Sequence, residues 1–115
     1  VNVSNTAGSV GILGRVQNST NFYGLVLSGG QWKIFKTVSG TVTILGSGAY
    51  SYTANTWHRL SLSMVGTNLT ASVSTNGSTF TSLGSATDST FTSGKVGLRS
   101  SGAVTSFDDI LVRPA

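Results

Sequence analysis

The chain has 115 residues, no cysteine, a single histidine and a formal net charge of +4 at pH 7. This length fits one domain, residues 1–115, built around a single hydrophobic core. Seven lysines and arginines stand against three acidic residues, so the high isoelectric point reflects a shortage of acids more than a surplus of bases. The lack of cysteine excludes a disulfide framework, a thiol nucleophile and a thiolate metal site.

The basic residues are spread along the chain and do not form the stripe, interleaved with aromatic residues, that is typical of nucleic-acid binders. They are Arg15, Lys33, Lys36, Arg59, Lys95, Arg99 and Arg113. We therefore expect no nucleic-acid partner. No apolar run approaches ~18 residues, so we expect no membrane span.

In chain order, residues 1–9 predict a short strand or an arm, without the pattern of a signal peptide. Three strands then form a predicted meander at 10–17, 22–28 and 31–37. A four-residue loop at 18–21 joins the first pair, and the two glycines at 29–30 join the second. The abundance of serine, threonine and glycine disfavours helix, and none is expected.

Side chains alternate along a strand, so pairing through these turns sorts the meander into two faces. The face predicted to be core holds Ile12, Gly14, Val16, Tyr23, Leu25, Leu27, Trp32, Ile34 and Lys36. The face predicted to meet solvent holds Leu13, Arg15, Gln17, Phe22, Gly24, Val26, Lys33, Phe35 and Thr37. On it, Arg15 and Phe35 are predicted to flank Gly24 and to leave a shallow notch between a guanidinium and an aromatic ring.

The clearest hairpin pattern runs from Trp57 to Gly77. A turn at Gly66 and Thr67 pairs Met64 with Leu69, Leu62 with Ala71 and Leu60 with Val73. One face of this hairpin is apolar and the other is almost all hydroxyl groups, which is typical of an antiparallel sheet with one face on a core.

Further strands are predicted at 42–45, 78–83, 95–99 and 104–112, with a loop at 85–89. About nine or ten short strands with regular turns predict an all-β fold, a two-sheet antiparallel β-sandwich of the jelly-roll type. The residues predicted to be buried are Leu25, Leu27, Ile34, Leu60, Leu62, Val73, Leu98 and Ile110.

The order of several motifs across residues 10–113 resembles the concanavalin A-like, LamG-like jelly rolls. The motifs are Asn21-Phe-Tyr-Gly-Leu-Val-Leu, Trp57-His-Arg-Leu-Ser-Leu, Gly66-Thr-Asn-Leu, Asn76-Gly77, Phe91-Thr-Ser-Gly-Lys-Val-Gly-Leu and Phe107-Asp-Asp-Ile-Leu-Val. The resemblance implies a lectin-like, carbohydrate-binding module that is secreted and appended to a glycan-degrading enzyme. Family members commonly begin with additional strands, so this chain is either a compact version or lacks N-terminal strands of a larger domain.

A catalytic role is not expected. Glycoside hydrolysis needs two carboxyl groups that flank one bond, whereas Asp88 falls in a predicted loop and the adjacent Asp108 and Asp109 point to opposite faces of a strand. His58 falls on the apolar face of its hairpin, and we expect a hydrogen-bonded residue at the edge of the core. No glutamate is present to donate a proton.

The resemblance also implies that the chain could bind a structural calcium ion, because some related jelly rolls hold one with an aspartate of the last strand. Here that residue would be Asp108. The alternative is a solvated or arginine-paired carboxylate.

Sugars present apolar C–H faces that stack on rings, and hydroxyl groups that need donors and acceptors. Two predicted surfaces offer both: the solvent face of the meander, and the hydroxyl face of the second hairpin. The candidate carbohydrate-binding residues are Arg15, Gln17, Phe22, Lys33, Phe35, Trp57 and Arg59. For Trp57, capping the end of the core is an alternative.

A rival interpretation is a structural or adhesive extracellular domain that associates through its sheet edges. Few charged residues guard the predicted edge strands against such pairing.

Overall fold

The computed structural model describes residues 2–3, 9–28, 30–50, 56–74, 79–101 and 105–106. Every regular element in this part of the chain is a β-strand. Within it there is no helix that could cross a membrane. The predicted all-β fold class is confirmed.

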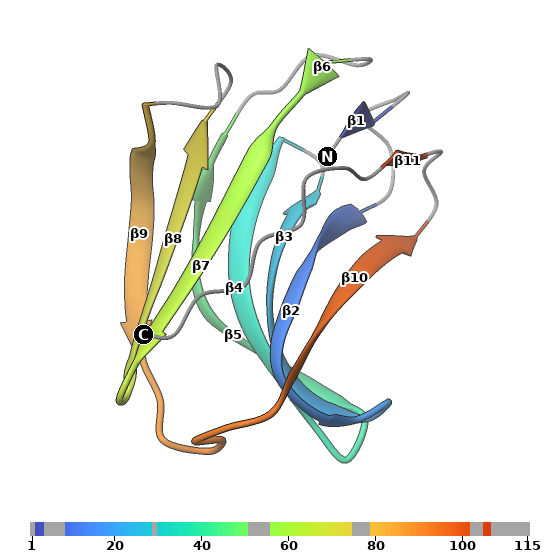
Figure 1. The fold of residues 1–115 in the computed structure, drawn as a ribbon, viewed down its shortest axis with the longest axis vertical. Coiled ribbons are helices and arrows are strands. Elements are labelled where there is room, and N and C mark those ends of the chain that lie inside the picture. The colour runs from blue at the N-terminus through green and yellow to red at the C-terminus, as the bar shows by residue number, and fades with distance from the viewer. Residues whose placement is uncertain are drawn as a thin grey trace.

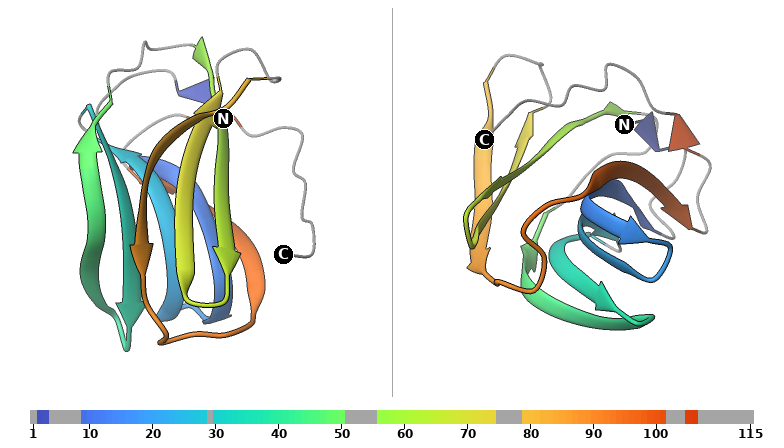
Figure 2. Two further views of the ribbon diagram at one scale, coloured as in Figure 1. Left: turned by 90° about the vertical axis from the view of Figure 1, so that its left-hand side faces the viewer. Right: turned by 60° about the horizontal axis from the view of Figure 1, so that its bottom comes forward.

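Five strands form one antiparallel sheet in the order β10-β2-β3-β4-β5. They are β2 (Ser9–Asn18), β3 (Asn21–Ser28), β4 (Gln31–Val38), β5 (Thr41–Ala49) and β10 (Lys95–Ser101). A second antiparallel sheet comprises β7 (Arg59–Val65), β8 (Asn68–Ser74) and β9 (Thr81–Thr87). Figures 1 and 2 show the two sheets face to face, which confirms the predicted sandwich.

Three two-residue strands pair at one end of the sandwich, uppermost in Figure 1. They are β1 (Asn2–Val3), β6 (Thr56–Trp57) and β11 (Thr105–Ser106). Because β1 lies between the other two, the start of the described chain is joined to segments that come much later in the sequence.

Two hairpins have the register predicted from their turns. In the β3–β4 hairpin Leu25 pairs with Ile34, and in the β7–β8 hairpin Leu62 pairs with Ala71. Gly66, in the second turn, has φ +58°, a left-handed conformation that glycine adopts without steric cost. These registers place one apolar face of each hairpin, with Leu25 and Ile34 on the first and Ala71 on the second, between the sheets.

Two strand predictions are wrong in extent, because the glycines at 46, 48 and 84 do not end the strands. The strand predicted at 42–45 is the longer β5, and the one predicted at 78–83 is β9, which takes up part of the predicted 85–89 loop. The interior glycines of both strands make room for Trp32. A Cβ atom on Gly84 or Gly48 would lie 2.5 or 2.6 Å from the Trp32 side chain.

The predicted register between β2 and β3 holds at the turn but is wrong from Gly14 to Val10. The turn has two residues, with Asn18 paired to Asn21, and the register shifts between Gly14 and Asn18. Asn18 Oδ1 accepts hydrogen bonds from the backbone N–H and the hydroxyl of Thr20, at 3.0 Å each. Such an asparagine side chain stabilises a tight turn, and the bulge behind it absorbs the extra residues.

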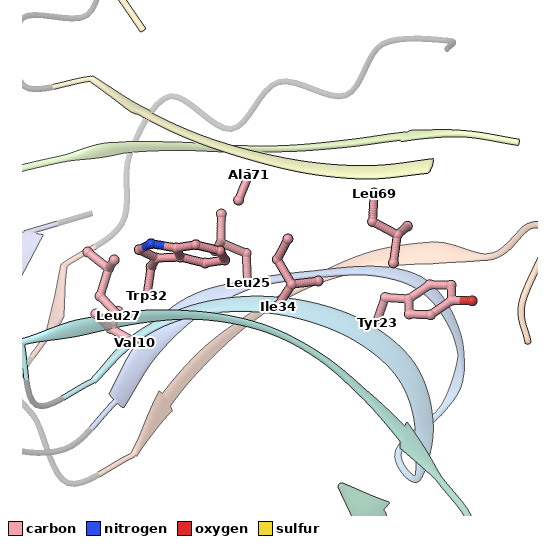
Figure 3. Close-up of a cluster of buried hydrophobic side chains, with 8 residues drawn as sticks. All are labelled: Val10, Tyr23, Leu25, Leu27, Trp32, Ile34, Leu69 and Ala71. Atoms are coloured by element: carbon pink, nitrogen blue, oxygen red, sulfur yellow. The ribbon is translucent and has the colours of Figure 1, made fainter. Parts of the chain in front are cut away.

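The main core lies between the two sheets. Leu69 and Ala71 project from β8 toward side chains of the five-stranded sheet (Figure 3). The cluster comprises Val10, Tyr23, Leu25, Leu27, Trp32, Ile34, Leu69 and Ala71. Trp32 is thus a core residue, as predicted.

Most of the predicted buried set can be compared with the structure. Leu25, Leu27, Ile34 and Val73 are buried, which confirms those predictions. Leu60 and Leu62 are only half-buried, although both pack against the cluster. The side chain of Leu98 and the whole of Ile110 lie outside the described residues.

A second apolar cluster lies on the opposite face of the five-stranded sheet. It comprises Phe22, Val26 and Phe35, with Leu13 and Val16 packed against it. The prediction that this face meets solvent is therefore wrong for Phe22 and Phe35, which are 8% and 3% exposed. The strands bow toward the main core (Figure 3), so their other face is concave and its side chains converge and bury one another.

Candidate functional site

The concave face is the surface of the five-stranded sheet that is directed away from β7, β8 and β9. The register of the sheet assigns to it Leu13, Val16, Phe22, Gly24, Val26, Gln31, Lys33, Phe35, Thr37, Val42, Ile44, Ser47 and Lys95. Three of the predicted sugar-binding residues, Phe22, Lys33 and Phe35, are among them. The structure therefore brings this part of the predicted site together.

The predicted notch over Gly24 is filled. A Cβ atom on Gly24 would lie 2.4 Å from Cζ of Phe35 and 3.0 Å from Cδ2 of Leu13. Phe22 and Phe35 meet edge to face, with ring centroids 6.2 Å apart and an interplanar angle of 83°. The two rings form the floor of the concave face and leave no flat ring surface for a sugar.

The accessible apolar part of the concave face lies along β5. Val42 and Ile44 are 52% and 49% exposed, and they pair with Thr37 and Phe35. Farther along the face, Lys33 is half-buried. The concave face thus combines apolar contact area on the edge strand β5 with a cation on the neighbouring strand β4.

Thr37 contributes an unusual polar atom to the concave face. The residue is 5% exposed, and its Oγ1 is buried without a hydrogen-bond partner in the described part of the chain. Buried hydroxyl groups nearly always have a hydrogen-bond partner in folded proteins. The Thr37 hydroxyl, which has none among the described residues, is therefore an exception.

Arg15 does not lie on the concave face, contrary to the sequence prediction. It sits in the bulge of β2 with φ +46°, and its guanidinium donates hydrogen bonds toward the other sheet. Nη1 reaches the carbonyl oxygens of Gly66 and Phe91 at 2.8 and 3.1 Å, and Nη2 reaches that of Met64 at 3.1 Å. Leu13 takes the place opposite Gly24 that was predicted for Arg15.

Gln17 follows Arg15 away from the predicted site. Its Nε2 donates to the carbonyl oxygen of Arg15 at 3.1 Å and to that of Ser93. Both residues hold the segment between β9 and β10 against the end of β2, which is a structural role.

A polar network, which we call the end network, occupies the same end of the sandwich. It consists of Tyr23, Lys36, Asp88 and Thr90. Asp88 Oδ1 accepts hydrogen bonds from the Tyr23 hydroxyl at 2.6 Å and from the Thr90 N–H at 2.8 Å. Lys36 Nζ lies 2.8 Å from Asp88 Oδ2 and 3.0 Å from the Thr90 hydroxyl.

These contacts shift the acid–base equilibria of the end network. Burial alone would raise the pKa of Asp88, but hydrogen bonds from Lys36, Thr90 and Tyr23 outweigh it and hold the pKa well below its ordinary value. Burial, together with the hydrogen bond to Asp88, raises the pKa of Tyr23. At neutral pH the network is therefore an ionised carboxylate among donors.

The end network also joins the two sheets. Asp88 and Thr90 belong to the connection that leads from β9 to β10 (Figure 1), whereas Tyr23 and Lys36 are on β3 and β4. The Tyr23 hydroxyl accepts a hydrogen bond from the Phe91 N–H at 3.1 Å, and the two rings pack edge to face. The sequence analysis did not predict this network. The available signal was the predicted pairing of Tyr23 with Lys36 on the core face, because a buried lysine needs an acidic partner.

His58 is a hydrogen-bonded core-edge residue, as predicted. It is 3% exposed, and its Nδ1 lies 3.2 Å from the hydroxyl of Tyr50. Burial raises the pKa of Tyr50.

The remaining predicted site residues, Trp57 and Arg59, belong to strands of the other two sheets. Arg59 is exposed on β7 and pairs with Ser74, so it belongs to the three-stranded sheet. The side chain of Trp57 lies outside the described residues. A role for Trp57 in binding stays a prediction.

The calcium prediction depends on Asp108, which lies outside the described residues. Within the described ranges, no group of three or more histidine or acidic side chains could hold a metal ion. Calcium binding at Asp108 therefore also stays a prediction.

The fold is a two-sheet antiparallel β-sandwich that resembles a known protein in structure. The sequence matches no family model and no curated protein. The structure does match that of the carbohydrate-binding module CBM66 from Bacillus subtilis, with a TM-score of 0.78 and 18% sequence identity. The match covers 89% of this chain and 63% of that one. The two proteins share a fold, and this chain spans less than two thirds of the other's length.

Proposed function

We propose that this domain is a non-catalytic carbohydrate-binding module whose ligand lies on the concave face. The observation that carries the proposal is that half-exposed apolar side chains and polar side chains lie together on one concave sheet surface. The apolar residues are Val42 and Ile44, and the polar residues are Lys33 and Ser47. The fold shared with CBM66 supports the same function. Phe22 and Phe35 act as the floor that shapes the surface.

In this proposal the C–H face of a sugar packs against Val42 and Ile44. The hydroxyl groups of the sugar exchange hydrogen bonds with Lys33 and Ser47, which pair across β4 and β5. The surface is shallow and offers no open ring for stacking, so the affinity per site falls in the millimolar to micromolar range, ~−4 to −8 kcal/mol.

The chemistry of Asp88 supports a non-catalytic role. A general acid needs a pKa near the working pH and access to the substrate. Asp88 has a lowered pKa and is held inside the end network by Lys36, Tyr23 and Thr90. We expect no hydrolysis of any glycan by the purified domain.

The proposal extends to the setting of the domain. A glycan-binding module of this kind is secreted, and attachment to a catalytic domain would hold that enzyme on an extracellular polysaccharide. The rival function, association through sheet edges, predicts concentration-dependent oligomers. Light scattering on the purified domain over a range of concentrations tests it, and a monomer throughout would reject it.

Affinity electrophoresis in gels that contain different polysaccharides tests the proposed site. We expect Ile44→Ser and Val42→Ser to weaken binding about threefold each, since each removes part of ~1 kcal/mol of apolar contact. Val65→Ser is the matched control, because Val65 is 55% exposed on β7 of the other sheet.

Loss of binding in Val65→Ser, with Val42→Ser and Ile44→Ser like the parent, would move the site to the three-stranded sheet. No retardation by any polysaccharide would reject carbohydrate binding itself.

A further inference from the structure

We propose that the concave face selects acidic glycans, chains that carry carboxylate or sulfate groups. This inference rests on the proposed function and names the substrate class of the same site. It follows from where the cations lie and from what surrounds them.

Two lysines stand on the concave face, on either side of its apolar floor. Lys33 pairs with Val26 and Ser47, in the middle of the sheet. Lys95 pairs with Val16 at the start of β10. Both therefore belong to the surface that carries Phe35.

Neither lysine is neutralised by a residue that the structure describes. In the described part of the chain, Lys33 and Lys95 have no ion-pair or hydrogen-bond partner, whereas Lys36 on the core face is paired with Asp88 at 2.8 Å. The described residues of the concave face include no acid. The positive charge of this face is thus available to a ligand.

The two charges are spaced for a polymer. Lys95 lies three strands away from Lys33 and about four residues along the strand direction, which places their backbones ~20 Å apart. The half-buried Leu13 lies between them on β2, whereas Val26, beside Lys33, is buried. An extended chain of several sugars could cross this surface with one acidic group near each lysine.

Charge complementarity makes an acidic glycan the favoured occupant. A neutral chain would desolvate Lys33, which is already half-buried, and return no opposite charge. An acidic chain would return an ion pair to each lysine, and the pair at half-buried Lys33 would be screened less by salt than the pair at exposed Lys95.

The experiment compares polygalacturonate with the same polymer after its carboxyl groups have been reduced to alcohols. Affinity electrophoresis or calorimetry at low salt measures binding of the whole chain to both polymers. We expect tighter binding to the acidic form and weakening as salt is added. Lys33→Gln and Lys95→Gln should each lose about two- to fivefold on the acidic polymer and little on the neutral one.

Arg59→Gln is the matched control. It removes one positive charge, as the two lysine variants do, but from an exposed position on β7 of the other sheet. Equal losses in all three variants would show attraction to net charge alone and would overturn the inference.

The inference and the proposed function can fail separately. Equal binding to both polymers, or to a neutral polysaccharide only, would overturn acidic selectivity and leave carbohydrate binding in place. Binding to neither polymer, nor to any other polysaccharide tested, would overturn both. Thermal unfolding of each variant checks that the comparison is made between folded proteins.

Discussion

The end network and the concave face both involve the five-stranded sheet, but they differ in whether their polar groups have hydrogen-bond partners within the chain. In the end network Asp88 accepts hydrogen bonds from Tyr23, Lys36 and Thr90. On the concave face, Lys33 and the Thr37 hydroxyl have no partner in the described part of the chain. Both regions also contain packed aromatic rings, so packing alone does not distinguish them.

The difference separates a structural region from a candidate binding region. Polar groups that satisfy one another stabilise the fold and have little left to offer a ligand. Buried polar groups without a hydrogen-bond partner in the chain lower the stability of the fold unless a ligand or a water molecule forms the missing hydrogen bond. On the concave face the accessible group with this unused capacity is Lys33, because the Thr37 hydroxyl is buried, and this supports the proposal that a ligand lies there.

The largest expected effect concerns the floor of the concave face. Phe35→Ala should lower the free energy of unfolding by ~3–5 kcal/mol, because Phe35 is 3% exposed and packs on Phe22. Denaturant unfolding followed by tryptophan fluorescence measures the change. A loss below ~0.5 kcal/mol would mean that the ring behaves as a surface residue, as the sequence pattern had indicated.

The end network should lose less when it is broken. Asp88→Asn removes the charge and weakens its bonds to Lys36 and Tyr23, which should cost ~1.5–3 kcal/mol, the range for hydrogen bonds to charged groups. Lys36→Met, measured alone and combined with Asp88→Asn, gives the coupling energy of the pair. Glycan binding should be unchanged, and a binding loss without unfolding would contradict the structural role.

Acid should weaken the same network. Asp88 keeps its charge to lower pH in the folded chain than in the unfolded one. Its contribution is therefore complete above the pKa of an unfolded aspartate and is lost as the pH falls toward the folded pKa. We expect the free energy of unfolding to decrease below pH ~5, and to decrease less in Asp88→Asn. Parallel pH profiles for the two proteins would exclude Asp88 as the source.

The sequence predicted those parts of the fold that depend on short-range patterns. The β3–β4 and β7–β8 registers follow from alternation and a glycine-containing turn, and both are confirmed. The β2–β3 register is as predicted at the Asn18 turn and wrong beyond it, because the bulge at Arg15 sets a step of four residues on β2, from Gly14 to Asn18, against a step of two on β3. Alternation carries no information about where a bulge falls.

The candidate site was predictable only in part, for a related reason. The alternation pattern placed Phe22, Lys33 and Phe35 on one face, and the structure brings them together. Their depth of burial depends on the curvature of the whole sheet, which no local pattern reports. The end network joins Tyr23 to Asp88 across 65 residues of sequence, and only the packing of the two sheets makes that contact.

The smallest expected effect tests the unsatisfied hydroxyl directly. Thr37→Val replaces the buried Oγ1, which has no partner in the described part of the chain, with a methyl group of similar size. Removing an unpaired buried polar group should raise the free energy of unfolding by ~1 kcal/mol. Thr43→Val, at an exposed position on β5, controls for the general preference of valine for strands. A loss of stability in Thr37→Val alone would show that the hydroxyl is satisfied in solution, and the concave face would then have less unused capacity than its geometry indicates.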